Sequence, residues 1–140
     1  MIKLIKLKQQ TIDLALLIFT VILGIFSYIF NLGWIRLIFF LPFLIYNLII
    51  LISGIIYVSK NCNEGNKKRK LVFYLGLLTY MLFNVFFIDG GDIGPSYCFF
   101  SLIKVYGNGA LFTHISMTSL AISLICIVLN IKAIITKKTL

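Results

Sequence analysis

The stretch ALFTHISMTSLAISLICIVLNIKAII, residues 110–135, decides the fold of this chain. It contains one lysine and no acidic residue. A helix needs about 20 predominantly apolar residues to cross about 30 Å of hydrocarbon, and this stretch is longer than that. A helix on the surface of a soluble protein would instead carry a charged face along its whole length. The stretch therefore predicts a transmembrane helix.

The rest of the chain has the same character. Of its 140 residues 61% are hydrophobic and 12% are charged, and the mean hydropathy is +1.07, whereas a soluble domain is about 25% charged. The apolar residues form four blocks, 12–34, 37–59, 71–89 and 110–135, without the alternation of membrane β-strands. The sequence predicts an all-α integral membrane protein, with residues 1–140 forming a single four-transmembrane-helix bundle.

The basic residues indicate how the spans are oriented. Of the 13 Lys and Arg residues, only Arg36 and Lys104 lie outside the N-terminal segment, the connection around 60–70 and the C-terminal end. Lys and Arg are retained on the cytoplasmic side of a membrane, so we expect both termini to be cytoplasmic. The abundance of Ile, Phe, Asn, Lys and Tyr is typical of AT-rich genomes, which favours the cytoplasmic membrane of a bacterium.

The net charge of +9 does not predict a nucleic-acid partner, because the basic residues form short clusters between apolar blocks. The three cysteines do not predict a disulfide or a zinc site either. In this topology Cys62 is cytoplasmic, Cys98 lies at the outer interface and Cys126 lies within the fourth span, too far apart for a bond within one chain. No cofactor or metal is expected.

Each predicted helix has one edge of small or polar residues at three- and four-residue spacing. Membrane helices associate through such residues, because lipid is as apolar as leucine and gives no hydrophobic drive. We interpret the edges as packing seams, with a pore or substrate path as the alternative. In the fourth span the edge is Ser116, Ser119, Ser123, Cys126, Asn130 and Ala133. In the other spans, in chain order, it is Asp13, Thr20, Gly24, Ser27 and Asn31, then Asn47, Gly54 and Tyr57, then Gly76, Tyr80 and Asn84.

The fourth span has a second edge of His114, Thr118 and Ala121, which predicts a central helix in the monomer or in an oligomer. An ionisable side chain in a membrane is a functional candidate. A structural histidine, hydrogen-bonded to a neighbour, is the simpler interpretation of His114. We expect Asn84 on the third span at a similar depth.

The loop after the third span, FFIDGGDIGPSYCFF at residues 86–100, holds two of the four acidic residues. Asp89 and Asp92 lie among glycines, and these residue types favour turns. Calcium would require six to eight oxygen ligands, more than this loop offers. We interpret the two carboxylates as turn residues in an outer recognition surface, followed by a short amphipathic helix in the membrane interface.

The function that fits these features is a non-enzymatic accessory or immunity-type subunit, which binds a protein partner or a second copy of itself in the bilayer. The outer loop and the helix seams would make the contacts. The alternative is a small oligomeric, holin-like pore lined by the serine edge of the fourth span. No motif of a serine hydrolase, zinc protease or phosphate-binding loop is present.

Cysteine labelling in intact cells tests the orientation. We expect a membrane-impermeant maleimide to leave Cys62 unlabelled, because the connection that carries it is cytoplasmic, and to label it once the cells are permeabilised. Labelling of Cys62 at the same rate in intact and permeabilised cells would overturn the topology. Cys98 should react from outside unless the fold of the loop buries it.

Overall fold

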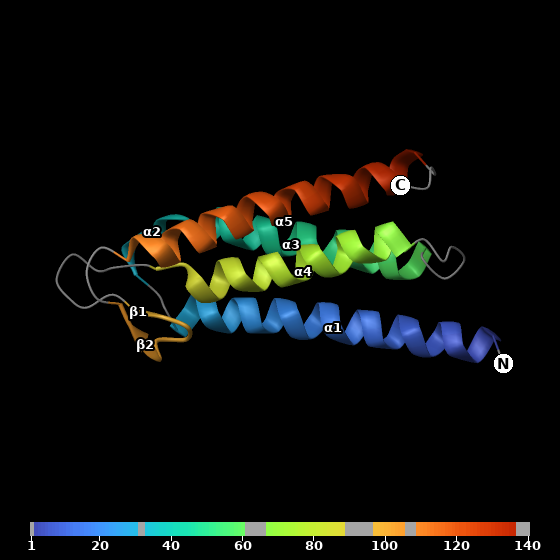
Figure 1. Cartoon of the computed structure of the whole chain (residues 1–140), viewed down its shortest axis with the longest axis horizontal. Helices are drawn as coiled ribbons and strands as arrows, with labels where there is room; N and C mark the ends of the chain where they lie inside the picture. The colour runs from blue at the N-terminus through green and yellow to red at the C-terminus, as the bar shows by residue number, and fades with distance from the viewer. Residues whose placement is uncertain (1, 31–32, 61–66, 89–96, 106–108, 137–140) are drawn as a thin grey trace.

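The computed structural model describes residues 2–30, 33–60, 67–88, 97–105 and 109–136. Within them, four helices are long and apolar enough to cross a membrane, so the chain is an all-α integral membrane protein built as a four-helix bundle (Figure 1). The elements in chain order are α1 (Ile2–Phe30), α2 (Trp34–Ile38), α3 (Phe40–Lys60), α4 (Lys67–Phe86), β1 (Tyr97–Cys98), β2 (Ile103–Lys104) and α5 (Ala110–Thr136).

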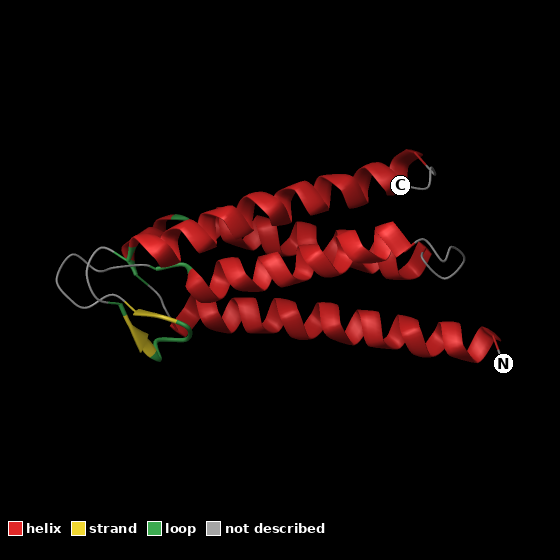
Figure 2. Ribbon diagram, viewed as in Figure 1, coloured by secondary structure: helices red, strands yellow, loops and turns green. Residues whose placement is uncertain are grey.

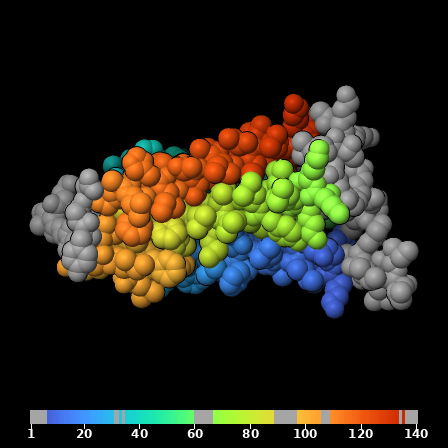
Figure 3. All heavy atoms as spheres, in the orientation of Figure 1, coloured from blue at the N-terminus to red at the C-terminus, as the bar shows by residue number. Residues whose placement is uncertain are grey.

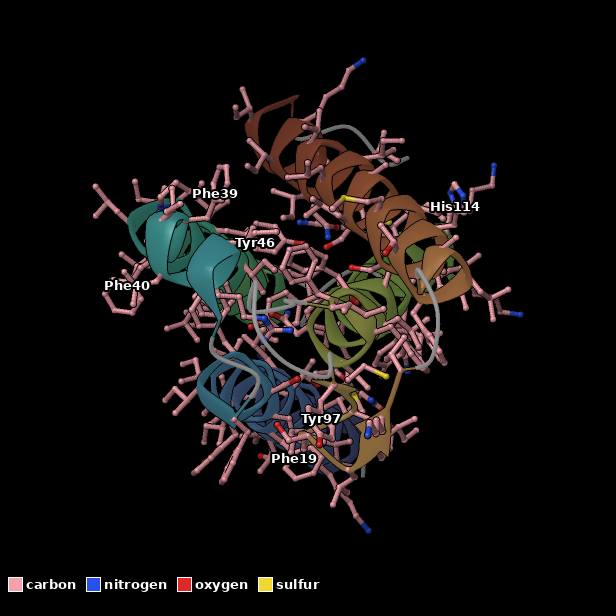
Figure 4. The ribbon with its side chains drawn as sticks, turned by 90° about the vertical axis from the view of Figure 1, so that its left-hand side faces the viewer. Phe19, Phe39, Phe40, Tyr46, Tyr97 and His114 are labelled. Carbon is pink, nitrogen blue, oxygen red and sulfur yellow. The ribbon has the colours of Figure 1, made fainter. Side chains whose placement is uncertain are left out.

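The long helices occupy the four corners of the bundle, as the view along its axis shows (Figure 4). α1 packs on α3 and α4, and α5 packs on the same two helices from the other side. We call the end that carries the strands the hairpin end, and the end that carries both chain termini the terminal end (Figure 1). Inside the bundle is a continuous apolar core made of Leu17, Val21, Ile50, Tyr57, Val58, Phe73, Leu77, Tyr80 and Ile127.

The first two helical boundaries differ from the predicted ones for physical reasons. α1 begins at Ile2, well before its apolar block, because the Lys, Leu and Gln residues there are good helix formers and include no stop signal. The break between α2 and α3 falls at Phe39. Proline at 42 would clash with the carbonyl of Ile38 in a continuous helix, so a new helix begins just before it.

The described residues of the small and polar edges face the inside of the bundle on all four helices, as packing seams would; Asn31 lies outside the described residues. On α5, Ser116, Ser119, Ser123, Cys126 and Asn130 are all at most 7% exposed. The second edge of α5 behaves differently, because His114, Thr118 and Ala121 are exposed. Within one chain α5 therefore has one covered face and not two.

Close approach between helices requires glycine at two places. A Cβ at Gly54 of α3 would lie 2.6 Å from the side chain of Leu17 on α1. A Cβ at Gly24 of α1 would overlap the hydroxyl of Tyr80, a fully buried side chain of α4. These glycines let α1 approach both of its neighbours.

The predicted interfacial helix is wrong. Residues 97–105 contain a β-hairpin in which Tyr97 pairs with Lys104 and Cys98 with Ile103 (Figure 2). In the hairpin the backbone N–H of Phe99 is free to donate to the carbonyl of Val85 at the end of α4, at 2.8 Å. In a helix such an N–H would donate to a carbonyl of the same helix. In the hairpin it donates to the end of α4.

The packing of α5 predicts the effect of a larger seam residue. Ser123 is fully buried, and its hydroxyl lies 2.7 Å from the hydroxyl of Tyr46. We expect Ser123→Leu to destabilise the bundle by about 1–3 kcal/mol, the usual cost of an overpacked interior. Ile125→Leu, on the exposed face of the same helix, is the matched control. Equal midpoints of thermal unfolding for the two variants in detergent would contradict the seam.

Candidate functional site

The hairpin end of the bundle is where α1 and α4 both terminate. The last four carbonyls of a helix have no partner within that helix. In the hydrocarbon region each unsatisfied backbone group costs several kcal/mol. The side chains that gather at this end therefore have to supply hydrogen-bond donors to two helix ends at once.

Arg36 of α2 supplies most of these donors. Its side chain is 1% exposed. Nη1 donates to the carbonyl of Ser27 in the last turn of α1, at 2.8 Å. Nη2 donates to the carbonyl of Asn84 in the last turn of α4, at 3.4 Å, and to the carbonyl of Phe87 just beyond it. A cation at two helix C-termini is also favoured by the dipoles of both helices.

Aromatic rings complete the surroundings of the guanidinium group. The Cζ atom of Arg36 lies 5.3 Å from the ring centroid of Tyr28 and 5.2 Å from that of Phe87. Both distances fall within the range of cation–π attraction. The Tyr28 hydroxyl donates to the carbonyl of Arg36 itself, and the Tyr28 ring stacks on Phe43 at 3.7 Å between centroids. The buried cation is thus enclosed by carbonyl oxygens and ring faces.

Three further side chains donate to carbonyls at the two helix ends. The Ser27 hydroxyl donates to Asn84 O at 2.7 Å, and the Ser116 hydroxyl of α5 donates to Phe83 O at 3.2 Å. Ser101 of the hairpin donates its hydroxyl to Phe30 O, the last carbonyl of α1. The hairpin therefore covers the ends of α1 and α4, beside which its atoms lie in Figure 3.

The turn of the hairpin holds an uncommon backbone conformation. Phe99, Phe100 and Ser101 have φ values of 52°, 57° and 61°, in the left-handed region that non-glycine residues rarely occupy. Such residues persist only where the surroundings fix them. Here the bonds from Phe99 N–H to α4 and from Ser101 to α1 provide that fixation.

A cavity of about 370 Å³ lies beside Arg36, between α3 and α5. Its floor is formed by buried side chains of α1, α2 and α4. Its mouth is flanked by exposed residues, Phe39 and Pro42 on one side and Met117 and Leu124 on the other. Its lining is aliphatic and aromatic almost throughout. The lining residues are Tyr28, Ile35, Arg36, Phe39, Pro42, Phe43, Tyr46, Phe83, Asn84, Phe87, Met117, Leu120 and Leu124.

Two hydrogen bonds close the cavity on the side of the terminal end. The hydroxyl of Tyr46 donates to Ser123 Oγ at 2.7 Å and so joins α3 to α5. The hydroxyl of Tyr80 donates to Asn47 Oδ1 and joins α4 to α3. Tyr46 points from α3 toward the interior of the bundle (Figure 4), and its ring lies 5.6 Å from that of Tyr80 and 6.1 Å from that of Phe83.

No known protein family, curated protein or solved structure matches this chain.

The structure brings together two of the side chains that the sequence singled out. Asn84, 1% exposed, lines the cavity, and Asn47, 6% exposed, holds Tyr80 at its closed side. The serine seam of α5 is buried against α4. His114 lies apart from the cavity and points away from the bundle (Figure 4). Asp89 and Asp92 lie outside the described residues.

Sequence reasoning did not identify Arg36 as a site residue, because it counted Arg36 only among the basic residues that indicate the orientation of the spans. Its signal was present, since it is a single charged residue between apolar residues in GWIRLIFF, 33–40, and an ionisable group at the edge of a membrane span is a functional candidate. The aromatic lining was not recognisable, because phenylalanine and tyrosine occur on every face of these helices.

A second polar cluster stands at the terminal end of the bundle. The buried carboxylate of Asp13 accepts hydrogen bonds from Gln9 at 2.7 Å and from the Tyr74 hydroxyl at 2.6 Å, which joins α1 to α4. Arg69 is 6% exposed there, with its Cζ atom 5.5 Å from the ring centroid of Tyr57. These contacts join helices, as those of Arg36 do at the other end.

Cys98 of strand β1 is fully buried, and burial raises the pKa of its thiol. The thiolate is the reactive form, so an impermeant reagent should reach Cys98 slowly in the folded protein. Leu102, which is 76% exposed at the turn, is the better position for a cysteine probe of this face.

Removal of the guanidinium group should uncap two helices at once. We expect Arg36→Met to lower the free energy of unfolding by about 3 kcal/mol or more, since several buried carbonyls lose their donor at about 1–3 kcal/mol each. Arg36→Lys should lose less, because it keeps the charge but lacks the planar fork. Thermal unfolding in detergent measures both, and wild-type stability in Arg36→Met would refute the capping role.

Proposed function

We propose that this chain is a non-enzymatic accessory or immunity-type protein of the bacterial cytoplasmic membrane. It lies with both termini in the cytoplasm and contacts another integral membrane protein through its hairpin end, which faces outward. The concentration of basic residues in the terminal segments and in the 60–70 connection supports this orientation.

The hairpin is the observation that carries the proposal. It is anchored to α4 through Phe99 N–H and to α1 through Ser101. Yet it presents apolar side chains to its surroundings, with Leu102 76%, Ile103 41% and Tyr97 37% exposed. Exposed apolar groups on a rigid support are typical of protein contact sites. A backbone held in a rare conformation at the same place supports a selected role for this turn.

The use made of the buried polar groups supports a binding role over catalysis. Arg36, Ser27 and Ser116 donate to helix carbonyls. Tyr46 and Tyr80 join neighbouring helices through Ser123 and Asn47. Each of these side chains is engaged in holding the bundle together, so a reaction would have to break contacts on which the fold depends.

An oligomeric pore is the second candidate, and the exposed edge of α5 is the observation that favours it. His114 and Thr118 are polar and exposed on a helix whose other exposed residues are mostly apolar. Contact between copies through this edge would shield them from lipid. The serine seam no longer supports this candidate, because packing against α4 occupies it within one chain.

Site-specific photocrosslinking tests the accessory role. We expect benzoylphenylalanine at Leu102 to give one discrete protein adduct in native membranes, because this side chain stands at the proposed contact. The same probe at Leu71, which is 66% exposed near the start of α4, is the matched control and should not give that adduct. Only lipid adducts at both positions would contradict the proposal.

Overexpression separates the two candidates. A pore should arrest growth and release a small dye from vesicles that contain the purified protein, and His114→Leu should change that release. An accessory protein should leave the vesicles sealed. If the wild type releases dye and substitutions of Leu102 do not change that release, the accessory role is contradicted and the pore is supported.

A further inference from the structure

We infer that the cavity between α3 and α5 is a binding site for one acyl chain of a membrane lipid, entered sideways from the bilayer. This site is separate from the proposed protein contact at the hairpin. The inference rests on the chemistry of the lining, on the direction of the mouth and on the way in which the bundle keeps the cavity open.

The lining offers a ligand almost no polar partner. Arg36 and Asn84 are its most polar residues, and both are 1% exposed. The guanidinium donates to the carbonyls of Ser27, Asn84 and Phe87, and the Asn84 amide donates to Tyr80 O at 2.8 Å. The space therefore presents ring faces and aliphatic carbons. Such a lining complements a hydrocarbon chain and not a headgroup, a nucleotide or a hydrophilic peptide.

The mouth is continuous with the surface that the bilayer covers. Four residues flank the mouth and are 44–56% exposed: Phe39 and Ile35 on one side, Met117 and Leu124 on the other. The neighbouring parts of α2, α3 and α5 carry further exposed apolar side chains. Met117 and Leu124 are seven residues apart on one helix, which corresponds to roughly 10 Å along the axis. The opening thus runs lengthwise along the helices, as lipid chains do. Water is a poor alternative, because apolar cavities stay dry.

Rigid contacts at both ends hold the space open. On the hairpin side, Arg36 fixes α2 to the ends of α1 and α4, and the stack of Tyr28 on Phe43 fixes the start of α3 to α1. On the other side, the bond between Tyr46 and Ser123 joins α3 to α5. The helices therefore cannot close over the gap without breaking these contacts, so the cavity persists and is filled from the surrounding lipid.

A photoreactive lipid tests the site in the unmodified protein. The probe is phosphatidylcholine with a diazirine on one acyl chain, added to the purified full chain in nanodiscs, with the labelled residues mapped by mass spectrometry. We expect labelling to concentrate on Phe39, Met117 and Leu124. Labelling spread evenly over the exposed faces of all four helices would overturn the inference, since it would show only the ordinary lipid shell.

A filled cavity provides the matched test. Leu120→Trp places a large ring in the space and should abolish the concentrated labelling. Leu48→Trp, on an exposed position of α3 outside the lining, should leave it unchanged. Persistence of the labelling pattern in a folded Leu120→Trp protein would overturn the site. If that variant does not fold, the wild-type map decides alone.

Another occupant would give a different result. If a second copy of the chain fills the cavity, the wild type should run as a dimer in nanodiscs and exclude the lipid probe from Met117 and Leu124, which would overturn the acyl-chain site. Loss of the protein adduct at Leu102 would not affect this outcome, because the crosslinking experiment at the hairpin and the lipid map report on different faces.

Discussion

The bundle depends on one guanidinium group that serves two helix ends. α1 and α4 both stop at the hairpin end, and each leaves carbonyl groups without a partner in its own helix. The carbonyls of Ser27 and Asn84 belong to residues that are at most 1% exposed, where an unpaired polar group is costly. Arg36 reaches both ends because its planar fork can donate in several directions at once. Desolvation of a cation is costly, and here the carbonyl dipoles of two helices and two ring faces offset that cost. The position of α2, and with it the start of α3, follows from this contact.

Elsewhere in the bundle, too, polar side chains form hydrogen bonds between helices. Every contact between neighbouring long helices combines small residues with at least one hydrogen bond, because lipid gives no hydrophobic drive for their association. Gly24 and Gly54 let α1 approach α4 and α3, and Tyr46 spans the wider separation of α3 and α5 with a phenol ring. The cavity lies between the same two helices, beside Arg36.

The sequence predicted the membrane class, the number of spans and the buried edge of each helix. These features come from composition and from three- and four-residue spacing, which depend on the helix itself. The prediction failed at residues 97–105, where the amphipathic pattern is typical of a short helix. The hairpin forms there instead, and its residues donate hydrogen bonds to the carbonyls of Val85 and Phe30, which are distant in the sequence. The prediction also failed to separate the two edges of α5, since Ser119 and His114 look alike until the neighbours are known. The cavity was unpredictable for the same reason, because its lining comes from all five helices.

The bond between Ser101 and Phe30 has a consequence for the order of events during synthesis. These residues are 71 positions apart, and at about 5–20 residues per second a ribosome needs several seconds to make the intervening chain. α1 therefore enters the membrane well before the group that finishes its end exists. Arg36, made soon after α1, can satisfy Ser27 early, whereas Phe30 must wait until α4 is in place and the hairpin has emerged. The end of the first helix is completed only when most of the chain has been translated, which ties the earliest inserted segment to one of the last segments to fold.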